Sequence, residues 1–363
     1  MTDIMARRLS SPPARPAAQE AAVVELIRLA SAAKTPNARL KAAIAATHAS
    51  SALSAKLKCH ANLAAGTLLH ELADEPAQMT THMRNALGLC HRSTIPSDLR
   101  IAVFCKSTAI IQQLLRDGVL KEARELLETV QGALQSDTEK VNEDTPAPDE
   151  KKEKAWLSVH VGVLHVSLLL REGPTKPVAR LLPSVLEQLD GLPEEPPDFP
   201  LAAGADTSES ACPTKSAMRR VLDFQKVLLL TMEGELREAV SALDGLMGET
   251  DYSEKPKEPP PSKKKKAADD GAADNATDWA IWHEGALLRA SIHLAHLEFD
   301  QALWCADQLK SVLCGKPKEG VRRPRHLGAH RAHGTSSYLL LLAHAAVACG
   351  QTGAAAGLVV PGA

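Results

Sequence analysis

Aromatic residues are scarce in this sequence: four Phe, two Tyr and four Trp make up only 3% of its 363 residues. Hydrophobic residues as a whole still reach 44%, and Ala, Leu and Val supply most of them. Ala and Leu favour helices, whereas strands are enriched in β-branched and aromatic residues. The composition therefore predicts an all-α protein with a core of small and aliphatic side chains.

An excess of charge is also missing, because the formal net charge is −2 and the pI is near 6.7. The chain as a whole thus lacks the positive footprint of a nucleic-acid binder. Its longest apolar run, WLSVHVGVLHVSLLL, is interrupted by His and Ser and is too short to span a bilayer. The N-terminal MTDIMARRLSSPPARPAAQE has no apolar core. It is typical of neither a secretory signal nor an anchor, although its Arg and Ser content is compatible with a transit peptide. We expect a soluble protein without membrane contact.

No pair of cysteines has CxxC spacing, which leaves a zinc ribbon or a redox motif unsupported. Most cysteines lie in apolar helical stretches. We therefore expect small buried side chains in a reducing compartment. The seven are Cys59, Cys90, Cys105, Cys212, Cys305, Cys314 and Cys349.

Catalytic motifs are absent as well: the sequence has no GxSxG, no phosphate-binding Gly loop, no HExxH and no carboxylate pair on an apolar helix face. His160 and His165 lie in an apolar run and are expected to be core or groove histidines. Three further histidines have helical metal-ligand spacing, but the Pro and Gly around them oppose a helix. Those three are His326, His330 and His333. We expect no enzyme, no cofactor and no metal.

What is present is a recurrent turn between helices, in DGVLKEARELL, EGELREAVSAL and LEFDQALWCADQL. Gly118 and Gly234 permit a tight reversal in the first two, and the third copy lacks the glycine. A small alanine follows in each and lets the second helix approach the first closely. These alanines are Ala123, Ala239 and Ala302, and CGQTGAAAGLV offers a weaker fourth copy. Any Ala- and Leu-rich hairpin could show one such turn, but three copies favour tetratricopeptide-like repeats in an α-α superhelical solenoid.

Charged or Pro-rich segments with few apolar residues separate the helical blocks, and we expect these segments to be disordered. In chain order we expect a disordered N-terminus at 1–19, N-terminal repeats at 20–135, a disordered insert at 136–154, a helical pair at 155–190, a Pro-rich insert at 191–215, a repeat at 216–248, a disordered Lys- and Pro-rich insert at 249–277, a repeat at 278–314, a basic loop at 315–335 and a terminal helix pair at 336–358.

Residues 37–130 resemble the N-terminal repeats of the small, tetratricopeptide-type subunit of the cohesin loader, a sister-chromatid cohesion factor family. The helices AAGTLLHEL and HMRNALGLC and the repeat that ends in LLETV carry this resemblance. Later stretches, at 227–246 and 286–313, resemble later repeats in the same order. The four polar inserts fall outside the family pattern, and members of the family are longer. Met79 also stands where a small residue is expected, which argues against close packing of that turn.

The resemblance implies a nuclear, chromatin-associated scaffold without chemistry of its own. It would bind the extended N-terminal segment of the large HEAT-repeat loader subunit in a heterodimer, and reach cohesin and chromatin indirectly. No small-molecule substrate is expected. In tetratricopeptide hairpins the inward face of the first helix lines the groove, and its residues here are mostly apolar or neutral. This disfavours capture of a free C-terminal carboxylate, which needs charged donors. The groove candidates are Thr108, Gln112, Phe224, Gln225, Arg289 and Ile292.

Two basic runs leave other functions open. The first is a candidate nuclear import signal, or equally a solvated charge run, and it consists of Lys263, Lys264, Lys265 and Lys266. The second, at 322–331, could contact DNA phosphates, although no aromatic residue interleaves for base stacking. The alternatives to the loader function are therefore another tetratricopeptide scaffold, of the anaphase-promoting-complex or motor-cargo type, and a direct DNA or chromatin binder.

Overall fold

The computed structural model describes residues 16–72, 75–92, 94–140, 148–194, 196–197, 199, 213–248, 285–295, 302 and 305. These residues are mostly helical and include no strand, which confirms the all-α prediction. Among them, no helix combines the length and the apolar character that crossing a membrane requires. The chain divides into two compact units, Met1–Gly173 with Asp190–Cys212 and Pro174–Leu189 with Pro213–Ala363.

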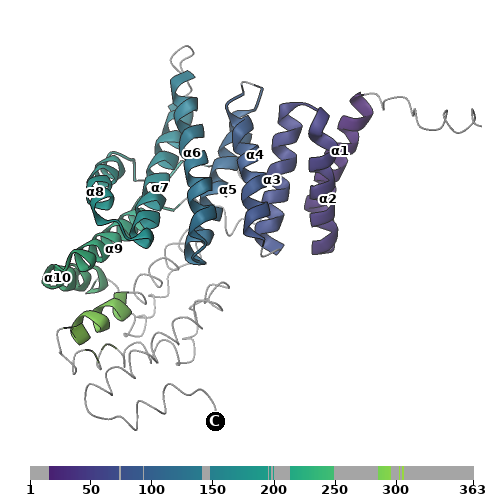
Figure 1. Cartoon of the computed structure of the whole chain (residues 1–363). Helices are drawn as coiled ribbons and strands as arrows, with labels where there is room; N and C mark the ends of the chain where they lie inside the picture. Colours follow the sequence, from purple (N-terminus) through teal and green to yellow (C-terminus); the bar gives the residue numbers. More distant parts are fainter. Residues whose placement is uncertain are drawn as a thin grey trace, which may run out of the picture. The chain divides into compact units, whose positions relative to one another are not determined.

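The first unit is a row of helices that follow one another in space as they do along the chain (Figure 1). Each helix packs against the next one, from α1 to α7, and α1, α3, α5 and α7 also pack against one another in succession. A further contact joins α4 and α6. The helices are α1 (Pro16–Ala32), α2 (Pro36–Ala49), α3 (Ala55–Leu72), α4 (Pro76–Cys90), α5 (Ser97–Arg116), α6 (Leu120–Lys140) and α7 (Pro148–Glu172).

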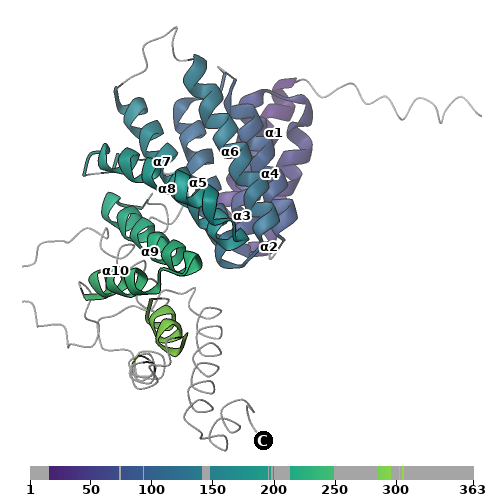
Figure 2. The ribbon, with the colours of Figure 1, turned by 60° about the vertical axis from the view of Figure 1, so that its left-hand side comes forward.

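The second unit contains α8 (Thr175–Asp190), α9 (Lys215–Glu233), α10 (Leu236–Gly248) and a helix at 285–295. Helices α9 and α10 pack as a hairpin and lie side by side in both views (Figures 1 and 2). Their core also takes in the helix at 285–295. It is formed by Phe224, Val227, Ala239, Leu243 and Ile292.

Proline and threonine mark where several helices begin. Pro opens α1, α2, α4 and α7, where its missing N–H costs nothing because the first amides of a helix have no partner within it. Thr35 caps α2, since its hydroxyl accepts a hydrogen bond from the backbone amide of Ala38 over 3.3 Å. Thr214 caps α9 in the same way, by accepting the amide of Ala217 over 3.1 Å. The residues at these positions therefore determine locally where the helices begin.

The structure corrects two of the expected disordered segments. Helix α1 already begins at Pro16, inside the expected N-terminal tail at 1–19. Helix α6 continues to Lys140 and α7 begins at Pro148, so both ends of the expected insert at 136–154 are helical. The reason is that charged residues such as Glu and Lys are good helix formers, so a charged composition does not by itself prevent a helix. The expected segments at 249–277, 315–335 and 336–358 lie outside the described residues.

The two predicted turn glycines occupy the left-handed region that only glycine adopts without strain, with φ of +74° at Gly118 and +85° at Gly234. Both helices end in a Schellman motif, in which the residue after the glycine donates its amide to a carbonyl five residues earlier, over 2.9 Å in each turn. The alanines that follow, Ala123 and Ala239, are fully buried, and so is Ala302. A third left-handed glycine, Gly173 with φ of +95°, ends α7 and was not predicted; Pro174 follows it and has no amide to donate, so this end is not a Schellman motif.

Helices α3 and α4 pack closely against each other although the large Met79 is buried in α4. Here the small residue lies on the preceding helix instead. A Cβ atom added to Gly66 of α3 would lie 2.5 Å from the sulfur of Met83 in α4, which is closer than real atoms approach. Close packing of α3 and α4 therefore depends on Gly66, and the expectation drawn from Met79 is wrong.

Replacing Gly118 by Ala should lower the free energy of unfolding by about 1 to 2 kcal/mol, because an L-residue is strained at this φ. No atom lies within 4 Å of the added methyl group, so crowding does not contribute. The control is Gly132→Ala in α6, an exposed helical position with equally open space, which should stabilise the chain by ~0.5 to 1 kcal/mol. Urea unfolding followed by circular dichroism measures both. Equal effects of the two substitutions would contradict the turn assignment.

Replacing Gly66 by Ala should destabilise the first unit by about 1 to 3 kcal/mol, because the new methyl group meets the fully buried Met83. The matched control is Gly88→Ala in α4, where nothing lies within 4 Å and a helix former replaces glycine. Thermal unfolding of both variants is the measurement. A Gly66→Ala protein that melts at or above the parent temperature would show that α3 and α4 are not packed this closely.

Candidate partner-binding face

Helices α3 and α5 are buried on most sides, but each keeps one stripe of side chains that is partly exposed. The positions in each stripe are three or four residues apart, so they lie on one side of the helix. We call the two stripes together the α3–α5 face. On α3 it comprises Lys56, His60, Ala64, Thr67 and Glu71, and on α5 it comprises Ala102, Cys105, Lys106, Ala109, Gln112 and Gln113.

An ion pair joins the two stripes and shows that they share one surface. The ammonium group of Lys106 on α5 lies 3.7 Å from the carboxylate of Glu71 on α3. Glu71 also lies 3.7 Å from the guanidinium of Arg39 on α2. Because these groups are partly exposed, the pairs contribute little to stability. They neutralise Glu71 and Lys106, and they leave the exposed Lys56 as the remaining charged side chain of the face.

The rest of the α3–α5 face is small and neutral. Ala64, Ala102 and Ala109 leave room for a backbone to approach, while the Gln112 and Thr67 side chains offer hydrogen-bonding groups. Burial, helped by the charge of Lys56, lowers the pKa of His60, which favours the neutral imidazole. The chemistry of this face suits non-covalent contact with a polypeptide.

Of the two groove candidates predicted on α5, Gln112 lies on this face and Thr108 does not. Thr108 is only 1% exposed, and its hydroxyl donates to the carbonyl of Cys105 over 2.9 Å. The next residue, Ala109, is the one that reaches the surface. The face therefore passes through Ala109 rather than through Thr108. The run of small or polar residues every three to four positions on an otherwise apolar helix was the signal that would have found it.

The candidates in the second unit are mostly core residues, which corrects the prediction. Phe224 is 7% exposed, Gln225 4% and Ile292 2%. Phe224 and Ile292 are brought together in one apolar cluster, so they hold α9 and the helix at 285–295 rather than lining an open surface. Arg289 pairs with Asp244 of α10 at 3.1 Å. An apolar residue on a first helix is equally suited to core and groove, and sequence alone did not separate the two.

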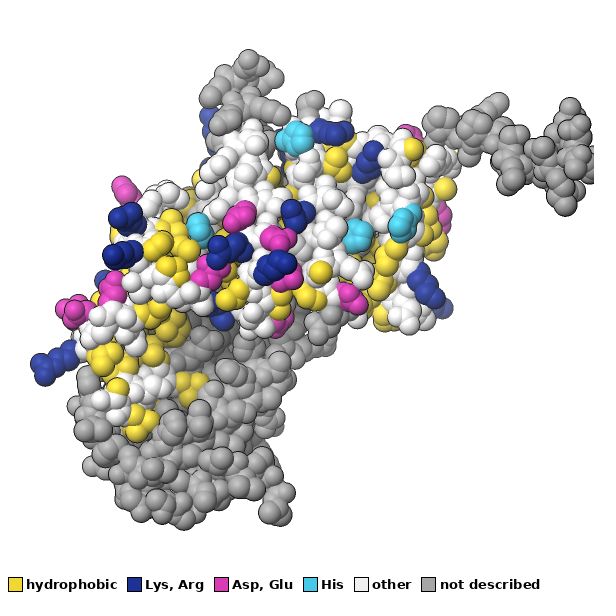
Figure 3. All heavy atoms as spheres, viewed as in Figure 1, with side chains coloured by type: hydrophobic (Ala, Val, Ile, Leu, Met, Phe, Trp, Pro, Cys, Tyr) yellow, Lys and Arg dark blue, Asp and Glu magenta, His cyan; other side chains and the backbone are white. Residues whose placement is uncertain are grey.

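A second surface, between α4 and α6, is polar, and its charged side chains pair with each other. A shallow depression of about 400 Å³ is lined by Thr81, Arg84 and Asn85 of α4 and by Thr129 of α6. The guanidinium of Arg84 donates to the carboxylate of Glu125 over 2.9 Å. Figure 3 shows one side of the molecule, on which acidic and basic side chains are interspersed rather than gathered by sign. The Lys run at 263–266 and the basic stretch at 322–331 lie outside the described residues.

Several histidine and cysteine side chains are buried or half-buried in the described ranges. There, no group of three or more His, Cys, Asp or Glu side chains is placed to hold a metal ion. His160 is buried, whereas His165 is half-buried and accepts a hydrogen bond from the amide of Gln131 over 3.0 Å. Cys59, Cys90 and Cys305 are buried and Cys105 is partly exposed. The remaining cysteines lie outside the described residues.

The buried imidazole of His160 should make stability depend on pH. Burial lowers its pKa to about 4 in the folded chain, from an ordinary value of 6.5. Between these two values the unfolded chain takes up a proton that the folded chain does not. The free energy of unfolding should therefore fall by up to about 3 kcal/mol as the pH drops from 7 to 4.

The variant His160→Leu removes this group and should flatten the decline, as measured by urea unfolding between pH 7 and pH 4.5. Some slope will remain, because burial also lowers the pKa values of His60, His82 and His165. A variant whose stability declines as steeply as that of the parent would show that His160 is not the main titrating group.

Comparison with known proteins yields no relative: no protein-family model, no curated protein and no solved structure matches this chain. Function must therefore be inferred from the residues and their arrangement.

Proposed function

We propose that this chain is a non-enzymatic scaffold of the tetratricopeptide type, which holds an extended segment of another protein against the α3–α5 face. Its partner would be the N-terminal segment of the large HEAT-repeat subunit of the cohesin loader. In that role the chain would act in the nucleus, as a subunit of the complex that loads cohesin onto chromatin for sister-chromatid cohesion.

The observation that carries this proposal is the order of helix contacts in the first unit. Each helix there packs on its successor, and the odd-numbered helices also pack on one another. Stacked helical hairpins produce this pattern, because each repeat touches only its neighbours. The two Schellman ends, at Gly118 and Gly234, and the buried alanines beyond them support a tetratricopeptide-like superhelix over other helical arrangements.

The α3–α5 face supports an extended polypeptide as the ligand. It lies on first helices of successive hairpins, which is the inward side in a solenoid of this type. Its small neutral residues fit a backbone, and two of its three charged side chains, Glu71 and Lys106, are paired within the chain. A face that captured a terminal carboxylate would instead present cationic donors without partners.

The choice of the cohesin loader as the partner complex rests on the sequence resemblance over residues 37–130. Affinity purification of the full chain from nuclear extract, followed by mass spectrometry, should therefore recover the large loader subunit. Recovery of ubiquitin-ligase or kinesin subunits without it would favour another tetratricopeptide scaffold and reject the loader assignment.

A direct role in DNA binding is the second candidate function, because the basic runs at 263–266 and 322–331 could neutralise phosphates. It would give binding of duplex DNA that weakens steeply with salt and with replacement of those lysines and arginines by Gln. If the purified chain shows no binding at low salt, this candidate fails.

The substitution Ala109→Glu should weaken binding of the partner segment by at least ~10-fold, because it places an unpaired carboxylate under the bound polypeptide. The site is partly exposed, so the fold should tolerate the change. Fluorescence anisotropy with the labelled N-terminal segment of the large loader subunit measures the affinity. The matched control is Ala77→Glu, at an exposed position of α4, which should bind like the parent. Equal affinities of both variants would remove the α3–α5 face from the proposal.

A further inference from the structure

Helix α1 is the outermost described helix of the row in the first unit, and no other described element packs against one of its long sides (Figures 1 and 2). Among the described elements it packs against α2, α3 and the short turn at Ser50–Ala52. Val23 and Ala30 point into that contact and are buried. The opposite side is exposed, and we call it the outer face of α1. It comprises Ala21, Ala22, Val24, Glu25, Arg28, Leu29, Ser31 and Ala32.

The outer face is unusually apolar for a free surface. Val24 is 54% exposed and Leu29 is 39% exposed, and they account for half of the large apolar side chains that are exposed in the described residues. The last helix of a repeat stack normally carries a polar outer side, because no neighbour covers it. Exposed apolar side chains gathered on one helix therefore indicate a surface that another element covers.

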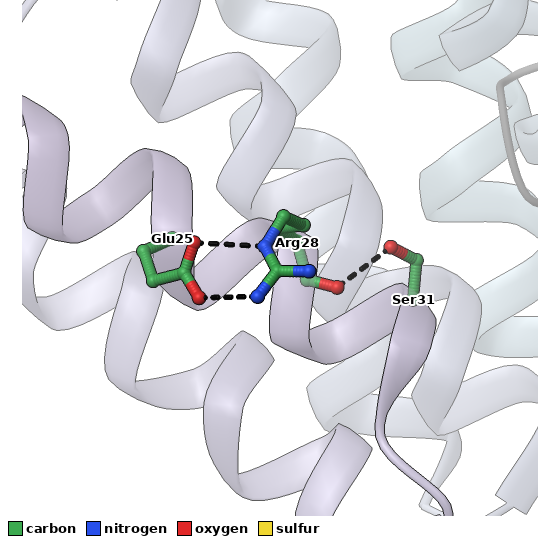
Figure 4. Close-up of polar contacts among 3 residues, drawn as sticks. All are labelled: Glu25, Arg28 and Ser31. Atoms are coloured by element: carbon green, nitrogen blue, oxygen red, sulfur yellow. Dashed lines mark hydrogen bonds and ion pairs between the residues drawn. The ribbon is translucent and has the colours of Figure 1, made fainter.

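The charged groups on this face indicate which kind of partner covers it. Glu25 and Arg28 lie along its centre and are joined by two parallel hydrogen bonds, of 2.8 and 2.6 Å (Figure 4). The hydroxyl of Ser31 donates to the backbone carbonyl of Arg28 over 2.9 Å. One acidic and one basic group thus stand three residues apart on the central stripe of the face, which consists of Ala21, Glu25, Arg28 and Ala32.

Such a stripe is complementary to itself when reversed. If two copies of α1 pair in antiparallel orientation about a two-fold axis between residues 26 and 27, Glu25 of each protomer lies level with Arg28 of the other. Ala21 then lies level with Ala32, and these small residues allow the two helices to approach closely. Parallel pairing would instead oppose like charges. A two-fold interface uses the same patch on both partners, which this stripe satisfies.

We propose that the outer face of α1 is a two-fold dimer interface that binds the same face of a second copy of this chain. The four charges then alternate in sign across the contact, and Val24 and Leu29 bury apolar area on its two flanks. The inference does not depend on the proposed function, because the α3–α5 face takes no part in it.

The test is the mass of the full chain in solution, by light scattering coupled to gel filtration and by sedimentation velocity. The parent should form a dimer of twice 38.7 kDa. Measurements from about 1 to about 100 µM follow its dissociation, which mass action governs. The double variant Val24→Lys with Leu29→Lys should be monomeric, with unchanged circular dichroism. The control Met232→Lys, at an exposed apolar residue of α9, should remain a dimer.

Charge exchange gives a second test that does not depend on those variants folding. Glu25→Arg and Arg28→Glu each oppose like charges across the two-fold axis, so each variant alone should dissociate at least ~10-fold more readily. An equimolar mixture of the two restores both opposite-sign pairs and should form a heterodimer. A parent chain that is monomeric at about 100 µM would overturn the proposal. So would a dimer that the lysine variants leave intact, or a mixture that stays monomeric.

Discussion

Close approach of helices that carry small side chains is the constraint on which the structure depends. A helix made of Ala, Leu and Val is apolar on more than one side, so one neighbour cannot cover it. Helix α7 shows this most clearly, because Trp156, Val161 and Val166 are all buried although they lie on different sides of it. In the row, each helix is covered by the helices before and after it. Glycine allows the tight turns between helices, and alanine or Gly66 allows neighbouring helices to approach closely.

The local features were predictable because they are local chemistry. The predicted turn glycines and buried alanines follow from backbone conformation, which neighbouring residues determine. The proline and threonine helix starts were not predicted, although they too follow from local capping. Most of the groove residues were not predictable from sequence, because residues such as Thr108, Phe224 and Ile292 suit a core as well as a surface. Only the packing of neighbouring helices determines whether such a residue lies in the core or at the surface. The same packing places Gly66 against Met83. The prediction of disorder at 136–154 is wrong at both described ends for a different reason, because Glu and Lys are good helix formers and a charged composition alone does not exclude a helix.

The row of helices also explains why the two surfaces discussed here differ. The α3–α5 face lies on helices covered by neighbours along the row, so its exposed stripe is narrow, neutral and suited to a threaded polypeptide. The outer face of α1 lies where the row ends, so it exposes a whole apolar side with one self-complementary ion pair. A chain with both could hold its partner while being joined to a second copy, because the two surfaces use different residues.

The most direct test of the scaffold account is lysine crosslinking with mass spectrometry on the full chain bound to the N-terminal segment of the large loader subunit. The account predicts crosslinks from that segment to Lys56 and Lys106, which lie on the α3–α5 face, and few to the exposed Lys41 and Lys121 on α2 and α6. Crosslinks confined to Lys41 and Lys121, or none to the first unit, would contradict it.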